Sequence, residues 1–128
     1  MLLRCVPRVI VRTVCKPTES VDKVMRSMLN IFPDLQIEQR NGELVGESRS
    51  VDVLEELLRN QRIRSAARAV FRSSVDGNRL IFRLSKQVAF MGKVNFAERS
   101  PLGDLEVTIE DDDLMKLIDR IAPRLPEE

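Results

Sequence analysis

Residues 35–48 read LQIEQRNGELVGES, two stretches with alternating character on either side of Asn41-Gly42. Asn-Gly is the commonest signature of a two-residue β-hairpin turn, because both residues accept the positive φ angles that such a turn needs. Residues 35–40 and 43–48 therefore predict two adjacent antiparallel strands. This hairpin establishes that the fold contains a sheet with antiparallel neighbours.

Further strands and helices are predicted on both sides of the hairpin. Some stretches alternate between apolar and polar residues, as strands do, and others repeat apolar residues at helical spacing. Thr18 and Ser50 carry side-chain oxygens suited to capping the start of a helix. The predicted strands are 8–15, 79–85 and 104–110, with 93–96 as a further candidate, and the predicted helices follow Thr18, Ser50 and Asp111–Asp113 and cover 63–71.

These elements predict one α+β domain, a two-layer sandwich with helices mainly on one face of a mixed or antiparallel sheet. A chain of 128 residues suits a single domain with a real core. No internal repeat interrupts it. The residues expected to share this core are Val24, Met28, Leu54, Leu57, Phe82 and Ile118.

The residue types that are missing restrict the chemistry. The chain has no His, so the side chain that most often performs acid–base catalysis near neutral pH is absent. Cys5 and Cys15 have neither CxxC spacing nor a His partner, which leaves no ligand set for zinc, although a disulfide between them stays open. We therefore expect no catalytic residues, no metal site and no cofactor, and we predict that the protein is not an enzyme.

Two short motifs have competing interpretations. Glu110–Asp113 is an acidic run that could hold Mg²⁺, but it also suits the N-terminus of a helix, where the dipole favours carboxylates, and we prefer this second interpretation. Gly92-Lys93 resembles the end of a phosphate-binding loop. However, Gln87 stands where that loop needs its first Gly, and Val94 stands where it needs Ser or Thr.

The N-terminal stretch does not predict targeting to a membrane. Arg4 and Arg8 interrupt its apolar residues before a signal-peptide core could form. No uncharged run approaches the roughly 20 residues that cross a bilayer. We therefore expect a cytoplasmic protein without a membrane partner.

Charge is segregated along the chain, although the net charge is only +1. Residues 59–99 contain ten basic and two acidic residues, a net charge of +8, whereas residues 100–128 contain three basic and nine acidic residues, a net charge of −6. Eight of the ten basic residues are Arg, which binds phosphate through a bidentate fork. This distribution favours a partner rich in phosphate, and RNA is the partner that we predict.

The Arg residues also have a geometric pattern. Arg64, Arg68 and Arg72 recur every four residues, so they form one stripe on their predicted helix. Arg79 and Arg83 share the strand face opposite Leu80 and Phe82. If the stripe and the strand face adjoin, they form one positive surface that binds RNA phosphates with little sequence preference.

A different interpretation also fits these charges. The Arg stripe can be the solvated face of an amphipathic helix that pairs with the acidic C-terminal segment. The protein would then be a structural or protein-interaction module with no role in nucleic-acid binding, and a homodimer is one form that it could take. Acidic residues that neutralise the stripe would favour this second hypothesis.

Several short stretches form a specific pattern along the chain. They are Pro17-Thr18-Glu19, Ile31-Phe32-Pro33-Asp34, Leu57-Leu58-Arg59, Gln61-Arg62-Ile63, residues 86–96 (KQVAFMGKVNF), Ser100–Gly103 and Val107-Thr108-Ile109. This pattern resembles an uncharacterised archaeal family, the UPF0201-like proteins, for which RNA binding or exosome association rests on prediction alone. The resemblance covers about residues 8–123, with residues 1–7 as an N-terminal extension and 124–128 as a tail. Ser85 and Val88 are mild departures from the pattern.

This resemblance implies a fold similar to that of a ribosomal protein that binds ribosomal RNA, with proteins of an RNA-processing complex as possible partners. It supplies no catalytic residues. Lys86 and Lys93 bracket the most specific of the similar stretches, and we add both to the predicted site. The predicted RNA-binding residues are Arg64, Arg68, Arg72, Arg79, Arg83, Lys86 and Lys93.

Overall fold

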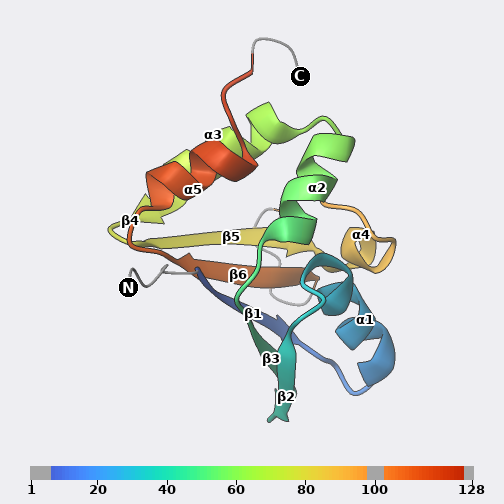
Figure 1. The fold of residues 1–128 in the computed structure, drawn as a ribbon. Helices are drawn as coiled ribbons and strands as arrows, with labels where there is room; N and C mark the ends of the chain where they lie inside the picture. The colour runs from blue at the N-terminus through green and yellow to red at the C-terminus, as the bar shows by residue number, and fades with distance from the viewer. Residues whose placement is uncertain (1–6, 98–102, 126–128) are drawn as a thin grey trace.

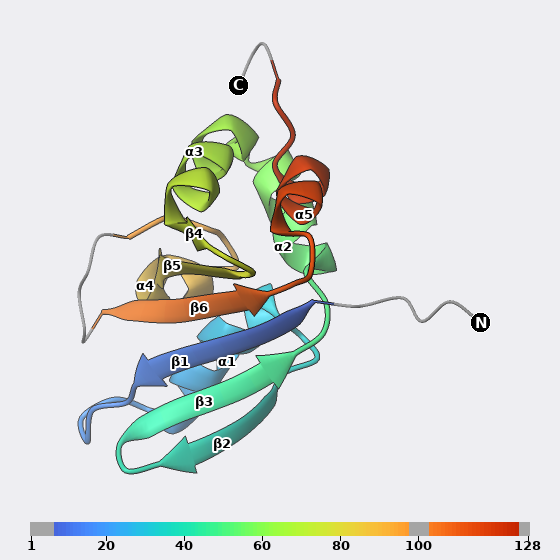
Figure 2. The same ribbon diagram turned by 90° about the vertical axis from the view of Figure 1, so that its left-hand side faces the viewer.

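The structure is a computed structural model, and it describes residues 7–97 and 103–125. Within these ranges six strands form one antiparallel sheet in the order β2-β3-β1-β6-β5-β4. The last strand of the chain, β6, lies between β1 and β5 in the middle of the sheet (Figure 2). The strands are β1 (Arg8–Val14), β2 (Gln36–Arg40), β3 (Glu43–Ser48), β4 (Val75–Asp76), β5 (Arg79–Ser85) and β6 (Asp104–Glu110).

The helices pack on one face of this sheet and leave the other face open, so the predicted α+β sandwich is confirmed (Figures 1 and 2). Helices α1 and α4 contact each other, while α3 contacts both β5 and α5. The open face carries the residues of β1 that alternate with the buried Val9 and Val11. The helices are α1 (Val21–Ile31), α2 (Asp52–Asn60), α3 (Arg64–Ser74), α4 (Lys86–Phe90) and α5 (Leu114–Ile121).

The core is continuous between the sheet and the helices. Five of the six predicted core residues are buried in it, whereas Leu57 is half-buried and packs against its surface. Phe71 of α3 and Phe82 of β5 lie with ring centroids 4.9 Å apart, and Phe96 contacts both rings. Cys15 is buried and has no disulfide partner among the described residues; Cys5 lies outside them, so a disulfide between the two is untested.

The hairpin forms as predicted, but two helix starts differ. Asn41 and Gly42 have φ angles of 45° and 80°, and β2 and β3 pair on either side of them. Ser20, rather than Thr18, caps α1, because its backbone is extended and its hydroxyl accepts a hydrogen bond from the N–H of Lys23. Val51 occupies the capping position of α2, one residue after the predicted Ser50.

The segment after β5 also differs from the prediction. Residues 86–90 form the short helix α4, capped by Ser85, whose hydroxyl accepts a hydrogen bond from the N–H of Val88. The predicted strand 93–96 is wrong as a full strand, since Phe96 makes one isolated bridge with Leu84. At the end of the chain, Asp113 caps α5 by accepting a hydrogen bond from the N–H of Lys116. The capping interpretation of the acidic run is thus confirmed.

Candidate nucleic-acid interface

The Arg stripe of α3 runs alongside α5. Arg68 donates hydrogen bonds from Nη1 to Asp119 Oδ1 at 2.7 Å and to the carbonyl oxygen of Ala122 at 3.2 Å. Only 17% of its side chain is exposed. Arg64 is half-buried at the first position of α3, and Arg72 is exposed in its last turn. One member of the stripe is therefore neutralised by the acidic C-terminal segment, as the second hypothesis expected.

Arg79 and Arg83 lie on the open face of the sheet, away from the α3 stripe. Arg79 is opposite Glu110 in the ladder between β5 and β6, and its Nη2 lies 3.2 Å from Glu110 Oε2. Hydrogen bonds from Arg79, and then from Arg8, hold the pKa of Glu110 below its usual value. Arg83 lies 3.2 Å from Glu106. The two strand arginines thus face neighbouring carboxylates rather than the α3 stripe.

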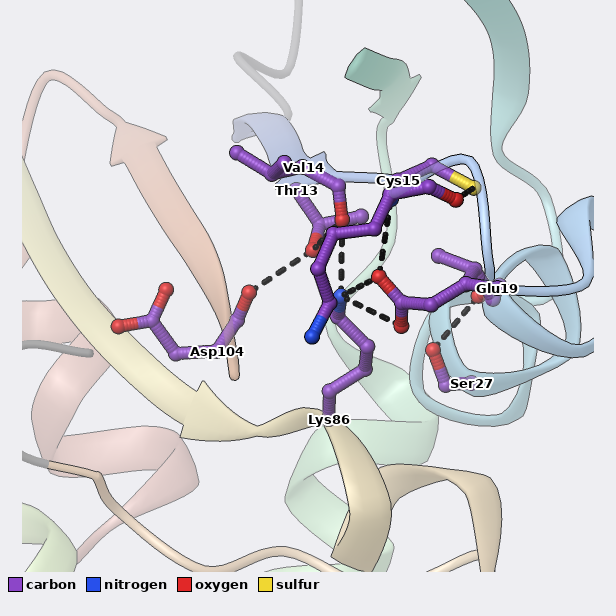
Figure 3. A network of polar contacts seen from close by, with 9 residues as sticks. Thr13, Val14, Cys15, Glu19, Ser27, Lys86 and Asp104 are labelled. Carbon is purple, nitrogen blue, oxygen red and sulfur yellow. Dashed lines mark hydrogen bonds and ion pairs between the residues drawn. The ribbon is translucent and has the colours of Figure 1, made fainter. Parts of the chain in front are cut away.

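Lys86 is buried at the start of α4, where it joins three parts of the fold (Figure 3). Its Nζ donates a hydrogen bond to the carbonyl oxygen of Val14, at the end of β1, at 2.8 Å. The same ammonium lies 3.2 Å from the carboxylate of Glu19, just before α1. Only 9% of the Lys86 side chain is exposed, so its ammonium has little access to solvent. It instead links the end of β1 and Glu19, just before α1, to the start of α4.

The carboxylate of Glu19 responds to this environment. Burial raises the pKa of Glu19, but the N–H of Lys16 and the ammonium of Lys86 outweigh that effect and place its pKa below the usual value. Glu19 is therefore ionised at neutral pH and balances the charge of Lys86. This ion pair explains why a lysine within the most specific part of the sequence resemblance is buried.

Lys93 is exposed on the segment that follows α4. The side chain of Gln61 holds this segment against the end of α2: its Nε2 donates to the carbonyl oxygen of Val94 at 2.8 Å, and its Oε1 accepts from the N–H of Val94 at 2.7 Å. Arg62 follows Gln61 directly in the chain, so it is the next residue after the one that holds this segment. Arg62 is exposed and was absent from the predicted site, although it lies inside the similar stretch Gln61-Arg62-Ile63.

The open face of the sheet mixes both signs of charge. Across β1, β6 and β5 the register aligns Arg8 with Glu110 and Arg79, and Arg12 with Glu106 and Arg83. All five Phe residues of the chain belong to the helices, to connecting segments or to the buried side of β5, and the chain has no Tyr or Trp. The described sheet face consequently offers no aromatic platform for stacking bases.

Two classes of site find no support in the described residues. Residues 7–97 and 103–125 contain no cluster of three or more Asp, Glu, Cys or His side chains placed to hold a metal ion. Over the same ranges, no helix combines the length and the apolar character needed to span a membrane.

Comparison with known proteins identifies the family. A family model described as RNA binding matches residues 8–110. A UPF0201 protein of Pyrococcus horikoshii is 43% identical over 115 residues, which cover 84% of this chain and 83% of that protein. This chain belongs to the UPF0201 family. A UPF0201 protein of Methanothermobacter thermautotrophicus is 41% identical, in a match that covers 84% of this chain and 85% of that protein. These relatives confirm the resemblance inferred from the sequence.

Solved structures of UPF0201 proteins confirm the fold. One UPF0201 crystal structure is 35% identical and superimposes with a TM-score of 0.88, covering 94% of this chain and 97% of its own. The UPF0201 protein of Methanococcus jannaschii is 41% identical with a TM-score of 0.83, covering 92% and 94%. In Archaeoglobus fulgidus, a 38% identical protein named UPF0200/UPF0201 is longer: the match covers 88% of this chain and 36% of that protein.

Proposed function

We propose that this UPF0201 chain is a non-enzymatic RNA-binding domain that holds RNA through its phosphates. The observation that carries the proposal is the match of residues 8–110 to a family model described as RNA binding. The basic segment 59–99, with its net charge of +8, supplies cations suited to phosphate. Association with an RNA-processing complex stays a prediction.

The seven predicted residues differ in how readily they could meet a phosphate. Arg72 and Lys93 are exposed, and no ion pair of either occurs among the described residues. Phosphate binding by the four ion-paired residues would require that a carboxylate be displaced first; these are Arg68, Arg79, Arg83 and Lys86. We therefore propose that Arg72 and Lys93 make the first contacts with phosphate. Arg64 is half-buried at the start of α3, next to the turn that follows α2.

Substitution of the two exposed cations tests this function. The double change Arg72→Glu, Lys93→Glu should weaken binding to RNAs of unrelated sequence. The slope of log affinity against log salt should also become shallower by about one unit per lost phosphate contact. Fluorescence anisotropy with labelled RNA over a salt series measures both quantities. If the parent protein shows no salt-dependent binding to any RNA, the proposal is wrong.

A matched control separates a local surface from net charge. Lys16 and Arg26 are exposed, and the structure describes no ion pair of either. Lys16→Glu with Arg26→Glu changes the net charge by the same amount as the test pair. The control should keep near-parental affinity. Equal losses in both double variants would show that total charge, rather than the surface around Arg72 and Lys93, governs binding.

A protein-interaction role is the second candidate. The Arg68–Asp119 ion pair favours it, because acidic residues neutralise part of the stripe. A chain of this class would bind a protein partner or a second copy of itself. Sedimentation that detects self-association, together with absent RNA binding, would support this candidate over the first.

A further inference from the structure

Three hollows of the surface differ in the charge of their linings. A hollow of about 350 Å³ between α1 and α4 contains the Glu19–Lys86 ion pair, and one of about 160 Å³ on the open sheet face contains three acidic side chains beside two arginines. The third, of about 480 Å³, lies between α3 and the segment 93–96. Its lining includes Lys93 and no acidic residue. This groove alone among the three suits a ligand that joins an apolar body to a negative charge.

The walls of the groove are mainly apolar, and hydrogen bonds hold them in place. Ile63, Ala66 and Val70 form one wall along the start of α3, and the segment 93–96 forms the other. Backbone hydrogen bonds hold that second wall at both ends: Lys93 N–H donates to Val88 at 3.1 Å, and Ser85 N–H donates to Asn95 at 2.9 Å. The Gln61 clamp on Val94 fixes its middle. A ligand would therefore meet a preformed surface, which reduces the entropy lost on binding.

Phe96 gives this groove an aromatic surface. Its ring is half-buried, and its centroid lies 5.6 Å from that of Phe71 and 5.9 Å from that of Phe82, both edge-on. The two buried rings hold the third in one orientation. Since an aromatic side chain of fixed orientation is a favourable partner for a nucleobase, the groove can accept a base by stacking.

Polar groups border the same groove. Lys93 and Asn95 line the groove and are exposed. The exposed Arg62 stands in the chain between Gln61 and Ile63, which both line the groove. A carboxamide such as that of Asn95 both donates and accepts hydrogen bonds, so it can pair with the edge of a base. Lys93 supplies positive charge for the phosphate attached to that base, and Arg62, between two lining residues, adds a second positive charge in the same part of the chain. The groove thus combines the three chemical features that one nucleotide requires.

We propose that this groove binds one unpaired nucleotide, with its base against Phe96 and its phosphate at Lys93 and Arg62. The nucleotide can belong to a single-stranded RNA or be free, and the RNA case rests on the proposed function. Single-stranded RNA would then bind more tightly than a duplex with the same number of phosphates, because paired bases cannot enter the groove.

A pair of matched variants tests the groove. Ala66 and Ala69 are both exposed on α3, but only Ala66 lines the groove. Ala66→Leu should narrow the groove and weaken binding of a single-stranded RNA oligonucleotide by about fivefold or more, the lower limit for one base stacked on an aromatic ring. Ala69→Leu should leave this affinity unchanged. An oligonucleotide of the same length without bases should bind equally to both variants and to the parent.

The outcomes separate this inference from the proposed function. If the oligonucleotide without bases binds as tightly as the complete RNA and Ala66→Leu has no effect, the nucleotide groove is wrong while phosphate binding stands. If RNA does not bind but adenosine or uridine monophosphate does, with a loss in Ala66→Leu alone, the groove is supported and the RNA function is wrong. If neither RNA nor mononucleotide binds, both are wrong.

Discussion

Arg62 has a positive φ angle of 59°, which an L-residue with a long side chain rarely adopts. The angle follows from the end of α2, where the N–H of Ile63 donates to the carbonyl oxygen of Leu58 and so closes the helix in a Schellman-like turn. Gly is the usual residue at this position. That Arg stands there suggests that its side chain has a use, which agrees with the nucleotide groove.

Replacement of Arg62 by Gly should therefore change stability and binding in opposite directions. Arg62→Gly should raise the free energy of unfolding by about 0.5–1 kcal/mol, because Gly adopts this backbone conformation without strain. The same variant should bind RNA more weakly. Urea unfolding and fluorescence anisotropy measure the two effects. Arg59→Gly, inside the last turn of α2, is the control and should lower stability by about 1 kcal/mol.

The ion pair of Glu19 with Lys86 predicts a pH dependence. Because the pKa of Glu19 is lowered in the folded protein, its contribution to stability is present above its unfolded pKa and is lost as pH falls through its folded pKa. Glu19→Gln should therefore be less stable than the parent at pH 7, and the difference should shrink below about pH 4. Urea unfolding at several pH values measures it. A difference that stays constant down to pH 3 would contradict this assignment.

At the scale of elements, strands with local signals were predictable and the short helix was not. Asn41-Gly42 specifies its hairpin through φ angles that few other pairs adopt, and the alternation in 79–85 specifies β5. Helix α4 has five residues, too few to display a helical repeat, and its position depends on distant contacts from Asn30 to the carbonyl oxygens of Ala89 and Phe90. Local sequence carries no trace of such contacts.

The hairpin contains a close approach that can be tested. Gly46 of β3 faces the core, and a Cβ atom there would lie 3.0 Å from Leu35 Cδ2 and 3.1 Å from Ile37 Cγ1. Gly46→Val should overpack this site and lower the free energy of unfolding by about 1–3 kcal/mol. Thermal unfolding followed by circular dichroism measures the change. Val45→Thr, on the open face of the same strand, should have a much smaller effect; similar losses in both would contradict the packing explanation.

At the scale of the whole molecule, charges that are separate in sequence meet in the fold. Strand β5 of the basic segment pairs with β6 of the acidic segment, which places Arg79 beside Glu110 and Arg83 beside Glu106. The sequence could predict the charge of each segment but not that these two strands are neighbours. For this reason the residue types of the candidate site were predictable. Its division between helix α3 and the open face of the sheet was not.

These partly exposed ion pairs also predict how the protein responds to salt. Exposed pairs contribute about 0–1 kcal/mol each, and salt screens them. Raising the salt concentration from 0.05 to 0.5 M should therefore lower the midpoint of thermal unfolding by less than about 5 °C, since about 1 kcal/mol corresponds to a few degrees in a domain of this size. Differential scanning calorimetry tests this. A larger decrease would contradict the small contribution assigned to these ion pairs.

The central place of β6 has a consequence for synthesis on the ribosome. Its partner β1 lies at the other end of the chain, with Arg8 opposite Glu110. A nascent chain that has been translated only through β5 therefore exposes two unpaired strand edges, those of β1 and β5, which are sites for aggregation. The sheet can close only when residues 104–110 have left the exit tunnel, so the pairing that joins β1 to β5 through β6 must come late in the synthesis of this domain.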